Sequence, residues 1–294
     1  MRKGARSRCA GPHGRALAAR SCPARAALTA ALALAAAAGC TGSAGAPAGP
    51  SGTRGCTAPV VAAGSYSSGS VSVSATTRTY RLATPAGDPH TARALVLVFH
   101  GSGSNGDGIR GYIGRAMEAA AGDEAIFAYP DGLSDGSATG WPDTGGRDVA
   151  FVDALLAQLA TELCYDPARV FAAGFSYGGY MSNTLGCARA GVVRAIAPLS
   201  GGGPWQTCNG QPVAAFIAHG TGDGTVAPSQ GQASRDHWLA ADGCGSTFHA
   251  TSPSPCQAYD GCAHDPVVWC AFTGGHEVQA WEPPAVWAFF AGLP

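Results

Sequence analysis

The segment 169–179 constrains the fold of this chain more than any other stretch. It opens with an apolar run that suits a strand buried on both faces of a parallel sheet. The pattern G-x-S-x-G follows directly, from Gly174 to Gly178, and a helical pattern comes next. The two glycines fit a turn so tight that a Cβ atom would meet neighbouring backbone. We therefore expect a strand, a sharp turn and a helix, with the hydroxyl of Ser176 exposed at the turn.

Apolar runs of this kind recur along the chain and alternate with helical patterns. With 46% hydrophobic residues in 294, the chain can bury a full core. The alternation predicts an α/β fold with a mostly parallel, doubly wound sheet and helices on both faces, preceded by an antiparallel pair at one edge. The expected strands are 71–73, 78–82, 94–99, 125–129, 169–174, 194–199, 213–218 and 266–272, and the expected helices are 108–121, 148–163, 177–188, 229–241 and 283–292.

The charge of the chain is divided unevenly. The first 25 residues hold seven positive charges and no acid, whereas the rest holds 11 Arg against 19 acids, a net charge of −8. An uncharged stretch of 13 residues, 26–38, follows the basic end and is typical of a signal peptide, which we expect over residues 1–40. Residues 41–70 are expected to be a disordered tether and 71–294 the folded domain. An acidic body without a basic stripe argues against a nucleic-acid partner.

The signal peptide ends in Ala-Ala-Gly-Cys, which resembles a bacterial lipobox with Cys40 as the lipid-modified residue. Cleavage at a nearby small-x-small site, which would release a free secreted protein, is the alternative. We expect export in either case, with a membrane contact only through a lipid on Cys40. The sequence implies no obligate protein partner.

Eight of the 11 cysteines lie beyond Cys40, and an even number in an exported chain favours disulfides. Their spacing lacks the paired C-x-x-C pattern of zinc sites, so we expect no metal. The pairing among them is left open: Cys56, Cys164, Cys187, Cys208, Cys244, Cys256, Cys262 and Cys270.

A serine hydroxyl becomes a good nucleophile only when a base takes its proton, so Ser176 requires a histidine and an acid that orients it. Asp223 follows the apolar run 213–218, and His276 follows the run 266–272. Both therefore lie at the carboxyl ends of strands, on the sheet edge expected for Ser176. Their chain order, serine, acid, histidine, matches that of hydrolases with this turn. His219 closes the strand 213–218 and is interpreted as a structural hydrogen-bonding residue. The other candidates fall on helices, in the Cys-rich loop or at the wrong strand end: Asp236, Asp242, Asp265, His237, His249 and His264.

Acyl transfer also requires two N–H donors for the oxyanion. The N–H of Tyr177, next after the nucleophile, is one candidate. The loop after the run 94–99 supplies the other, from Ser102 or, as the alternative, Gly101. The chemistry needs no metal and no organic cofactor. Trp141 and Trp205, in two long loops, are candidates for binding an aromatic acyl group, and packing is the alternative for both.

Several motifs stand in a particular order along the chain. They are Leu97-Val98-Phe99-His100-Gly101, Asp148-Val149-Ala150-Phe151-Val152, Cys164-Tyr165-Asp166, the segment 169–179, His219-Gly220-Thr221-Gly222-Asp223 and Gly274-Gly275-His276. Together they resemble the secreted feruloyl esterase and polyhydroxybutyrate depolymerase family over most of residues 75–292. The resemblance implies an extracellular α/β-hydrolase acting on carboxylic esters, with Ser176, Asp223 and His276 as its triad and the loop at Gly101 and Ser102 as oxyanion donor.

The resemblance favours the feruloyl esterase branch, because depolymerases often have Cys where this chain has Ser102. The expected substrate is then a small-molecule or polysaccharide-linked ester of a hydroxycinnamic acid. A polyhydroxybutyrate depolymerase is the first alternative. A prolyl-oligopeptidase-type peptidase is the second, since the segment 174–181 is similar to its nucleophile motif. A catalytically silent surface-binding lipoprotein is the alternative from another class.

Overall fold

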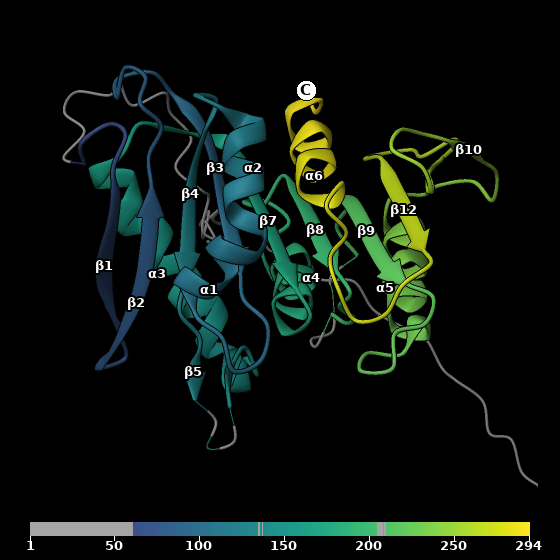
Figure 1. Cartoon of the computed structure of the whole chain (residues 1–294), viewed down its shortest axis with the longest axis horizontal. Helices are drawn as coiled ribbons and strands as arrows, with labels where there is room; N and C mark the ends of the chain where they lie inside the picture. Colours follow the sequence, from purple (N-terminus) through teal and green to yellow (C-terminus); the bar gives the residue numbers. More distant parts are fainter. Residues whose placement is uncertain (1–60, 135, 137, 205–207, 209) are drawn as a thin grey trace, which may run out of the picture. The chain divides into compact units, whose positions relative to one another are not determined.

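The structure is a computed structural model, which describes residues 61–134, 136, 138–204, 208 and 210–294 (Figure 1). The predicted signal peptide, Cys40 and Trp205 lie outside the described residues, as does most of the predicted tether. The first strand begins at Tyr66, upstream of the expected Val71.

In the described part of the chain, a ten-stranded sheet lies at the centre, in the order β1-β2-β4-β3-β7-β8-β9-β12-β11-β10. The six strands from β4 to β12 in this order run parallel, and the strands outside them pair antiparallel. The strands are β1 (Tyr66–Val73), β2 (Thr76–Ala83), β3 (Arg93–Phe99), β4 (Ala125–Pro130), β7 (Tyr165–Phe175), β8 (Ala195–Leu199), β9 (Ala214–Gly220), β10 (Phe248–Ala250), β11 (Cys256–Tyr259) and β12 (Val267–Phe272). A short hairpin, β5 (Leu133–Ser134) and β6 (Thr139–Gly140), stands apart.

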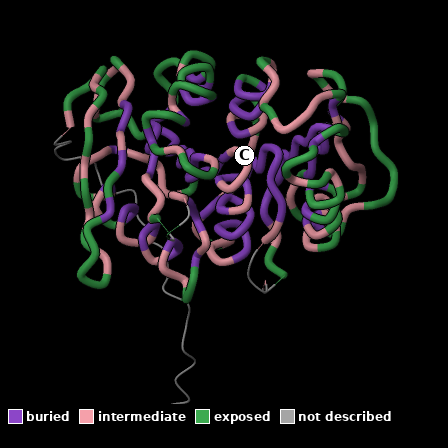
Figure 2. The backbone as a smooth tube through the Cα atoms, turned by 60° about the horizontal axis from the view of Figure 1, so that its bottom comes forward, coloured by how far each residue is buried: buried purple, intermediate pink, exposed green. Residues whose placement is uncertain are grey.

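Helices cover both faces of the sheet. They are α1 (Gly106–Ile109), the π-helical turn η1 (Arg110–Gly114), α2 (Arg115–Ala121), the 3-10 turn η2 (Thr144–Gly146), α3 (Arg147–Glu162), α4 (Tyr177–Ala188), α5 (Pro228–Ala241) and α6 (Glu282–Ala291). Side chains of α1, α2 and α6 join one core cluster, and those of α3, α4 and α5 join the other. Figure 1 shows α2 beside α6, and Figure 2 shows the buried strands between the helical layers. The predicted doubly wound α/β class is therefore confirmed.

Among the local differences from the expectation, two concern the first helix and the antiparallel end of the sheet. The helix predicted over 108–121 is interrupted by η1, where Gly111 and Gly114 lower helix propensity. At Gly114 a Cβ would lie 2.5 Å from the Tyr129 ring, so this turn packs closely on β4. The strands β10 and β11 lie outside the expected set. β10 is three residues long and exposed throughout, so it shows no hydrophobic alternation.

The cysteines of the described residues form disulfides. Cys187 pairs with Cys208, Cys244 with Cys262, and Cys256 with Cys270, while Cys164 is disulfide-bonded as well. Cys256 and Cys270 are also register partners on β11 and β12, so this bond fixes the antiparallel end of the sheet. Such bonds fit an exported protein in an oxidising compartment. Across the described residues, every helix falls short of the length and apolarity that a membrane span needs.

Candidate active site

Ser176 lies on the turn between β7 and α4, in a conformation that residues other than glycine seldom adopt. Its φ is 57° and its ψ is −116°, and its hydroxyl does not cap the helix. A Cβ at Gly174 would lie 2.3 Å from the carbonyl oxygen of Gly178, and one at Gly178 would lie 2.0 Å from that of Phe99. The motif thus has glycine where neighbouring backbone leaves no room. The strained turn aims the serine side chain away from the helix.

His276 and Asp223 extend from Ser176 in an unbroken chain of polar contacts. Nε2 of His276 lies 2.8 Å from Oγ of Ser176, and Nδ1 lies 2.7 Å from Oδ2 of Asp223. The three residues are far apart in sequence but follow β7, β9 and β12, whose carboxyl ends meet at one edge of the sheet. The structure therefore brings together all three residues expected from the sequence.

The surroundings of Asp223 keep its carboxylate ionised. Burial alone would raise its pKa, but the hydrogen bonds from His276 and from the N–H groups of Val226 and Thr225 outweigh burial and lower it. Both of those N–H groups donate to Oδ1, each at 2.8 Å. An ionised carboxylate only accepts hydrogen bonds, so Nδ1 of His276 must carry the proton. In the neutral imidazole Nε2 then has no proton and is placed to accept that of Ser176.

A second histidine contacts the same carboxylate. Nε2 of His219 lies 2.9 Å from the carbonyl oxygen of Val226 and 3.3 Å from Oδ2 of Asp223. Its ring is 1% exposed and occupies space that a Cβ at Gly231 would fill, 2.5 Å from Nδ1. The interpretation of His219 as a structural hydrogen-bonding residue fits these contacts, which hold the loop that carries Asp223.

The loop after β3 passes directly beside the nucleophile. A Cβ at Gly101 would lie 3.4 Å from Cβ of Ser176. The loop turns at Ser102 and Gly103, where the N–H of Ser104 donates to the carbonyl of Gly101 at 3.2 Å. Gly103 has a φ of +74°, which favours glycine at this position of the turn. Of the two residues predicted as oxyanion donors in this loop, Gly101 therefore lies next to Ser176 in space, and Ser102 follows it in the turn.

The side chain of His100 holds this loop in place. Its Nε2 accepts the N–H of Gly132 at 2.9 Å, so Nδ1 carries the proton and donates to the carbonyl oxygen of Gly101 at 2.7 Å. Burial lowers the pKa of His100, which favours the neutral ring that these two bonds require. Because the Gly101 carbonyl and the Ser102 N–H share one planar peptide, His100 fixes the direction of that N–H.

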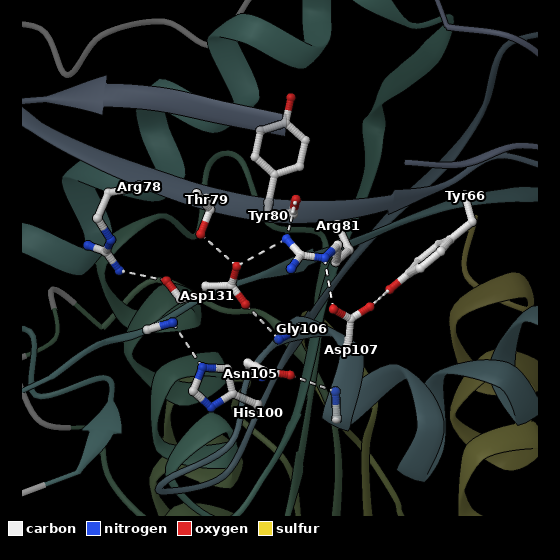
Figure 3. A network of polar contacts seen from close by, with 12 residues as sticks. Tyr66, Arg78, Thr79, Tyr80, Arg81, His100, Asn105, Gly106, Asp107 and Asp131 are labelled. Atoms are coloured by element: carbon white, nitrogen blue, oxygen red, sulfur yellow. Dashed lines mark hydrogen bonds and ion pairs between the residues drawn. The ribbon is translucent and has the colours of Figure 1, made fainter. Parts of the chain in front are cut away.

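Asp131, just after β4, ties the loop to strand β2 (Figure 3). Its Oδ1 accepts the N–H of Gly106 at 2.7 Å, and its Oδ2 accepts the hydroxyl of Thr79 at 2.7 Å. Its carbonyl accepts a hydrogen bond from Arg78 at 3.2 Å, and Arg78 also forms a buried ion pair with Asp148 at 2.9 Å. The loop beside Ser176 thus rests on a connected polar network.

The comparisons with known proteins agree on one kind of enzyme. Feruloyl esterase C of Emericella nidulans is 36% identical over 233 residues, which cover 72% of this chain and 83% of that protein. The chain belongs to the feruloyl esterase family. The probable feruloyl esterase C of Aspergillus clavatus is 34% identical over 222 residues, covering 69% of this chain and 79% of that protein. No family model matches the chain.

Solved structures show the same fold. The acetyl xylan esterase from Aspergillus awamori superposes with a TM-score of 0.57 at 16% identity, covering 72% of this chain and 94% of that chain. A ferulic acid esterase from Anaeromyces mucronatus superposes with a TM-score of 0.56 at 14% identity, covering 78% and 90%. The esterase therefore has the α/β-hydrolase fold and is a carboxylic ester hydrolase.

One sequence expectation for the esterase is wrong. Trp141 was a candidate for contacting substrate, but it is 0% exposed and packs against Phe99 with ring centroids 5.1 Å apart. Its indole N–H donates to the carbonyl of His100 at 2.9 Å, which places it in the core beneath the loop. The packing alternative holds for Trp141. In the part of the chain that the structure describes, no three His, Cys, Asp or Glu side chains are grouped to hold a metal.

The sequence also left two aromatic residues of the site unnoticed. Phe175 lies with its ring centroid 4.8 Å from that of His276, and the ring of Tyr112 meets Phe175 edge-on at 5.1 Å. Phe175 stands inside the G-x-S-x-G pattern, so its position beside the nucleophile was available as a signal. Tyr112 lies on η1, far from any motif, and nothing in the sequence marks it.

Proposed function

We propose that the esterase hydrolyses esters of hydroxycinnamic acids such as ferulate, with Ser176 as nucleophile, His276 as general base and Asp223 as the residue that orients the histidine. The observation that carries the proposal is the continuous contact from Ser176 through His276 to Asp223, at 2.8 and 2.7 Å. The names of the relatives support the choice of acyl group, since they are feruloyl esterases.

In the proposed reaction, Oγ of Ser176 attacks the ester carbonyl while its proton passes to Nε2 of His276. Asp223 stabilises the imidazolium that forms. The N–H groups of Tyr177 and Ser102, with Gly101 as the alternative donor in the loop, stabilise the oxyanion. The departing alcohol takes the proton from His276, and a water molecule repeats the sequence on the acyl-enzyme to release the acid.

Aromatic side chains support a preference for an aromatic acyl group. Phe175 lies against His276, and Tyr112 is 48% exposed next to Phe175. Aromatic rings attract one another in edge-on and offset arrangements, so a hydroxycinnamoyl ring has partners beside the triad. In this proposal Tyr112→Leu has a higher KM for methyl ferulate than Tyr112→Phe, which keeps the ring, and the two variants have the same KM for p-nitrophenyl acetate.

A fluorophosphonate probe and two substrates test the proposal directly. The wild-type enzyme should be labelled at Ser176 and should turn over methyl ferulate, while Ser176→Ala should lose both properties. The matched control is Ser229→Ala, an exposed serine at the start of α5. Full turnover by Ser176→Ala would overturn the triad. A wild-type enzyme that cleaves a hydroxybutyrate oligomer but not methyl ferulate would overturn the acyl group and favour a depolymerase.

We also propose that residues 1–40 direct export and that Cys40 carries a lipid anchor, with the segment between Cys40 and β1 as the tether to the domain. The basic start, the uncharged stretch 26–38 and the lipobox-like end support this proposal. Expression in a bacterial host with a Cys40→Ala comparison tests it. Release of the Cys40→Ala enzyme, but not of the wild type, from the membrane fraction is the expected result, and equal release of both would exclude the anchor.

A further inference from the structure

We propose that Ser200 and Tyr112 clamp the peptide bond between Glu277 and Val278 and thereby position His276 for catalysis. The inference rests on the proposed role of His276 as general base. Ser200 and Tyr112 act through the histidine and touch no reacting atom, so both are positioning residues.

Ser200 binds one end of this peptide from the core of the protein. It follows β8 directly and is 0% exposed. Its Oγ lies 3.0 Å from the carbonyl oxygen of Glu277, which can only accept, so the serine hydroxyl donates. Its own N–H donates to the carbonyl of Ala218 on β9 at 2.8 Å, which anchors Ser200 to the sheet.

Tyr112 binds the other end of the peptide from the surface. Its hydroxyl oxygen accepts the N–H of Val278 at 2.9 Å. The residue belongs to η1, the π-helical turn that follows α1. Its ring rests edge-on against Phe175, which limits the ways in which the hydroxyl can move. Turns of this rare kind occur often at functional sites.

The two bonds act on one rigid group. The Glu277 carbonyl and the Val278 N–H belong to the same planar peptide, so a bond at each end fixes both its place and its rotation. The peptide begins one residue after His276. Ahead of His276 the loop is held by backbone, where the N–H of Gly222 donates to the carbonyl of Gly274 at 2.8 Å. The clamp holds the loop on the opposite side of the histidine.

The backbone of Ser200 indicates that its hydroxyl has a role. Ser200 has a φ of +47°, a conformation that favours glycine and that costs a residue with a Cβ free energy. Glycine would relieve this strain but has no hydroxyl to offer Glu277. A strained, fully buried serine is therefore best explained by the bond that it makes to the loop of His276.

Loss of either hydrogen bond of the clamp should lower kcat and should leave KM almost unchanged. Catalytic groups need to lie within about 0.5 Å of their productive positions, and a displacement of about 1 Å can cost up to ~100-fold in rate. A loop freed at one end of one peptide should move less than that. We expect Ser200→Gly and Tyr112→Phe each to lower kcat about 10-fold, with KM within about twofold of wild type, on p-nitrophenyl acetate and methyl ferulate alike.

Each variant has a matched control in the same chain. Ser74 has the same φ of +47° but lies in the exposed turn between β1 and β2, so Ser74→Gly removes an equivalent strain away from the site. Tyr66 is 41% exposed and donates its hydroxyl to Asp107, so Tyr66→Phe removes a surface tyrosine hydroxyl that is not bonded to the loop of His276. Both controls should keep the wild-type kcat. Thermal unfolding of every variant shows whether the fold is intact, and Ser200→Gly should melt close to wild type, because the relief of strain offsets the lost hydrogen bond.

The double variant Ser200→Gly/Tyr112→Phe provides the decisive measurement. Because both bonds hold one peptide, its kcat should fall by clearly less than the roughly 100-fold product of the two single losses. A single variant with kcat within about twofold of wild type would overturn the clamp, as would losses that multiply in the double variant. A wild-type enzyme that turns over p-nitrophenyl acetate but not methyl ferulate would refute the proposed preference for hydroxycinnamoyl esters. The test of the clamp would still stand, because it can be made on p-nitrophenyl acetate.

Discussion

Replacing Asp223 by asparagine should almost abolish turnover, because the surroundings of this side chain dictate which way the amide faces. Oδ1 of Asp223 accepts two backbone N–H groups, from Thr225 and Val226, each at 2.8 Å. Turning the amide nitrogen toward these donors would lose both bonds, at a cost of about 1 kcal/mol or more for each. The carbonyl oxygen of the introduced amide should therefore keep these partners, which places its NH2 group opposite Nδ1 of His276.

This orientation of the amide changes the tautomer of His276. An NH2 group only donates, so Nδ1 of His276 must lose its proton and Nε2 must carry it. Nε2 then faces Ser176 as a donor and has no lone pair with which to accept the serine proton. An error of this kind in a serine–histidine–aspartate triad costs about 10,000-fold in kcat, which corresponds to about 5 kcal/mol of transition-state stabilisation. We expect a loss of that size for Asp223→Asn.

The assay is the steady-state hydrolysis of p-nitrophenyl acetate, together with the rate of fluorophosphonate labelling. Asp236→Asn is the matched control, since this acid lies on α5 with its side chain 62% exposed and pairs with neighbouring Arg235. Asp223→Asn should melt close to the wild-type temperature and should be labelled slowly, whereas Asp236→Asn should behave as wild type. If Asp223→Asn retained a tenth or more of the wild-type kcat, the derivation from the amide orientation would be refuted.

Two further predictions concern the turn and the stability. Gly178→Ala should prevent formation of the active turn, because its Cβ would lie 2.0 Å from the carbonyl oxygen of Phe99. Gly191→Ala, with open space around it, should leave kcat unchanged, and equal activity of the two variants would contradict this. Burial raises the pKa of Glu282 to about 8 from its ordinary value of 4.5, so the folded chain holds a proton that the unfolded chain releases, and stability falls as pH rises between those values. Thermal unfolding of Glu282→Gln should therefore depend less on pH over this window than that of the wild type, and an unchanged pH dependence would exclude Glu282 as the cause.

The three proposed triad residues could be predicted because each is tied to a recognisable strand. Ser176, Asp223 and His276 each follow an apolar run, and parallel strands bring their carboxyl ends to one sheet edge whatever the loops do. The G-x-S-x-G pattern at 174–178 and the order of the three residues along the chain were therefore sufficient to predict the proposed triad. The parallel arrangement of the central strands is confirmed by their registers.

The residues that support the triad could not be predicted, because their roles depend on contacts between distant segments. Ser200 and Tyr112 are 77 and 166 residues from the peptide atoms that they bind. The prediction that Trp141 contacts substrate was wrong for the same reason, because the sequence shows only a tryptophan in a long loop. Only the fold shows that its N–H is already bonded to the carbonyl of His100.

The two strained serines of the site share a structural explanation. Ser176 and Ser200, with φ values of 57° and 47°, stand directly after the neighbouring strands β7 and β8. The N–H of Ser176 donates to the carbonyl of Leu199, and that of Ser200 donates to the carbonyl of Ala218, so in each case the hydrogen bonding of the parallel sheet continues into the strained residue. Strained conformations persist where the surrounding structure over-determines them, and here the next strand does so. The sheet therefore supplies more than the placement of the triad: its hydrogen bonds hold in unfavourable conformations the two hydroxyls that the proposed mechanism requires, one to attack the ester and one to hold the histidine loop.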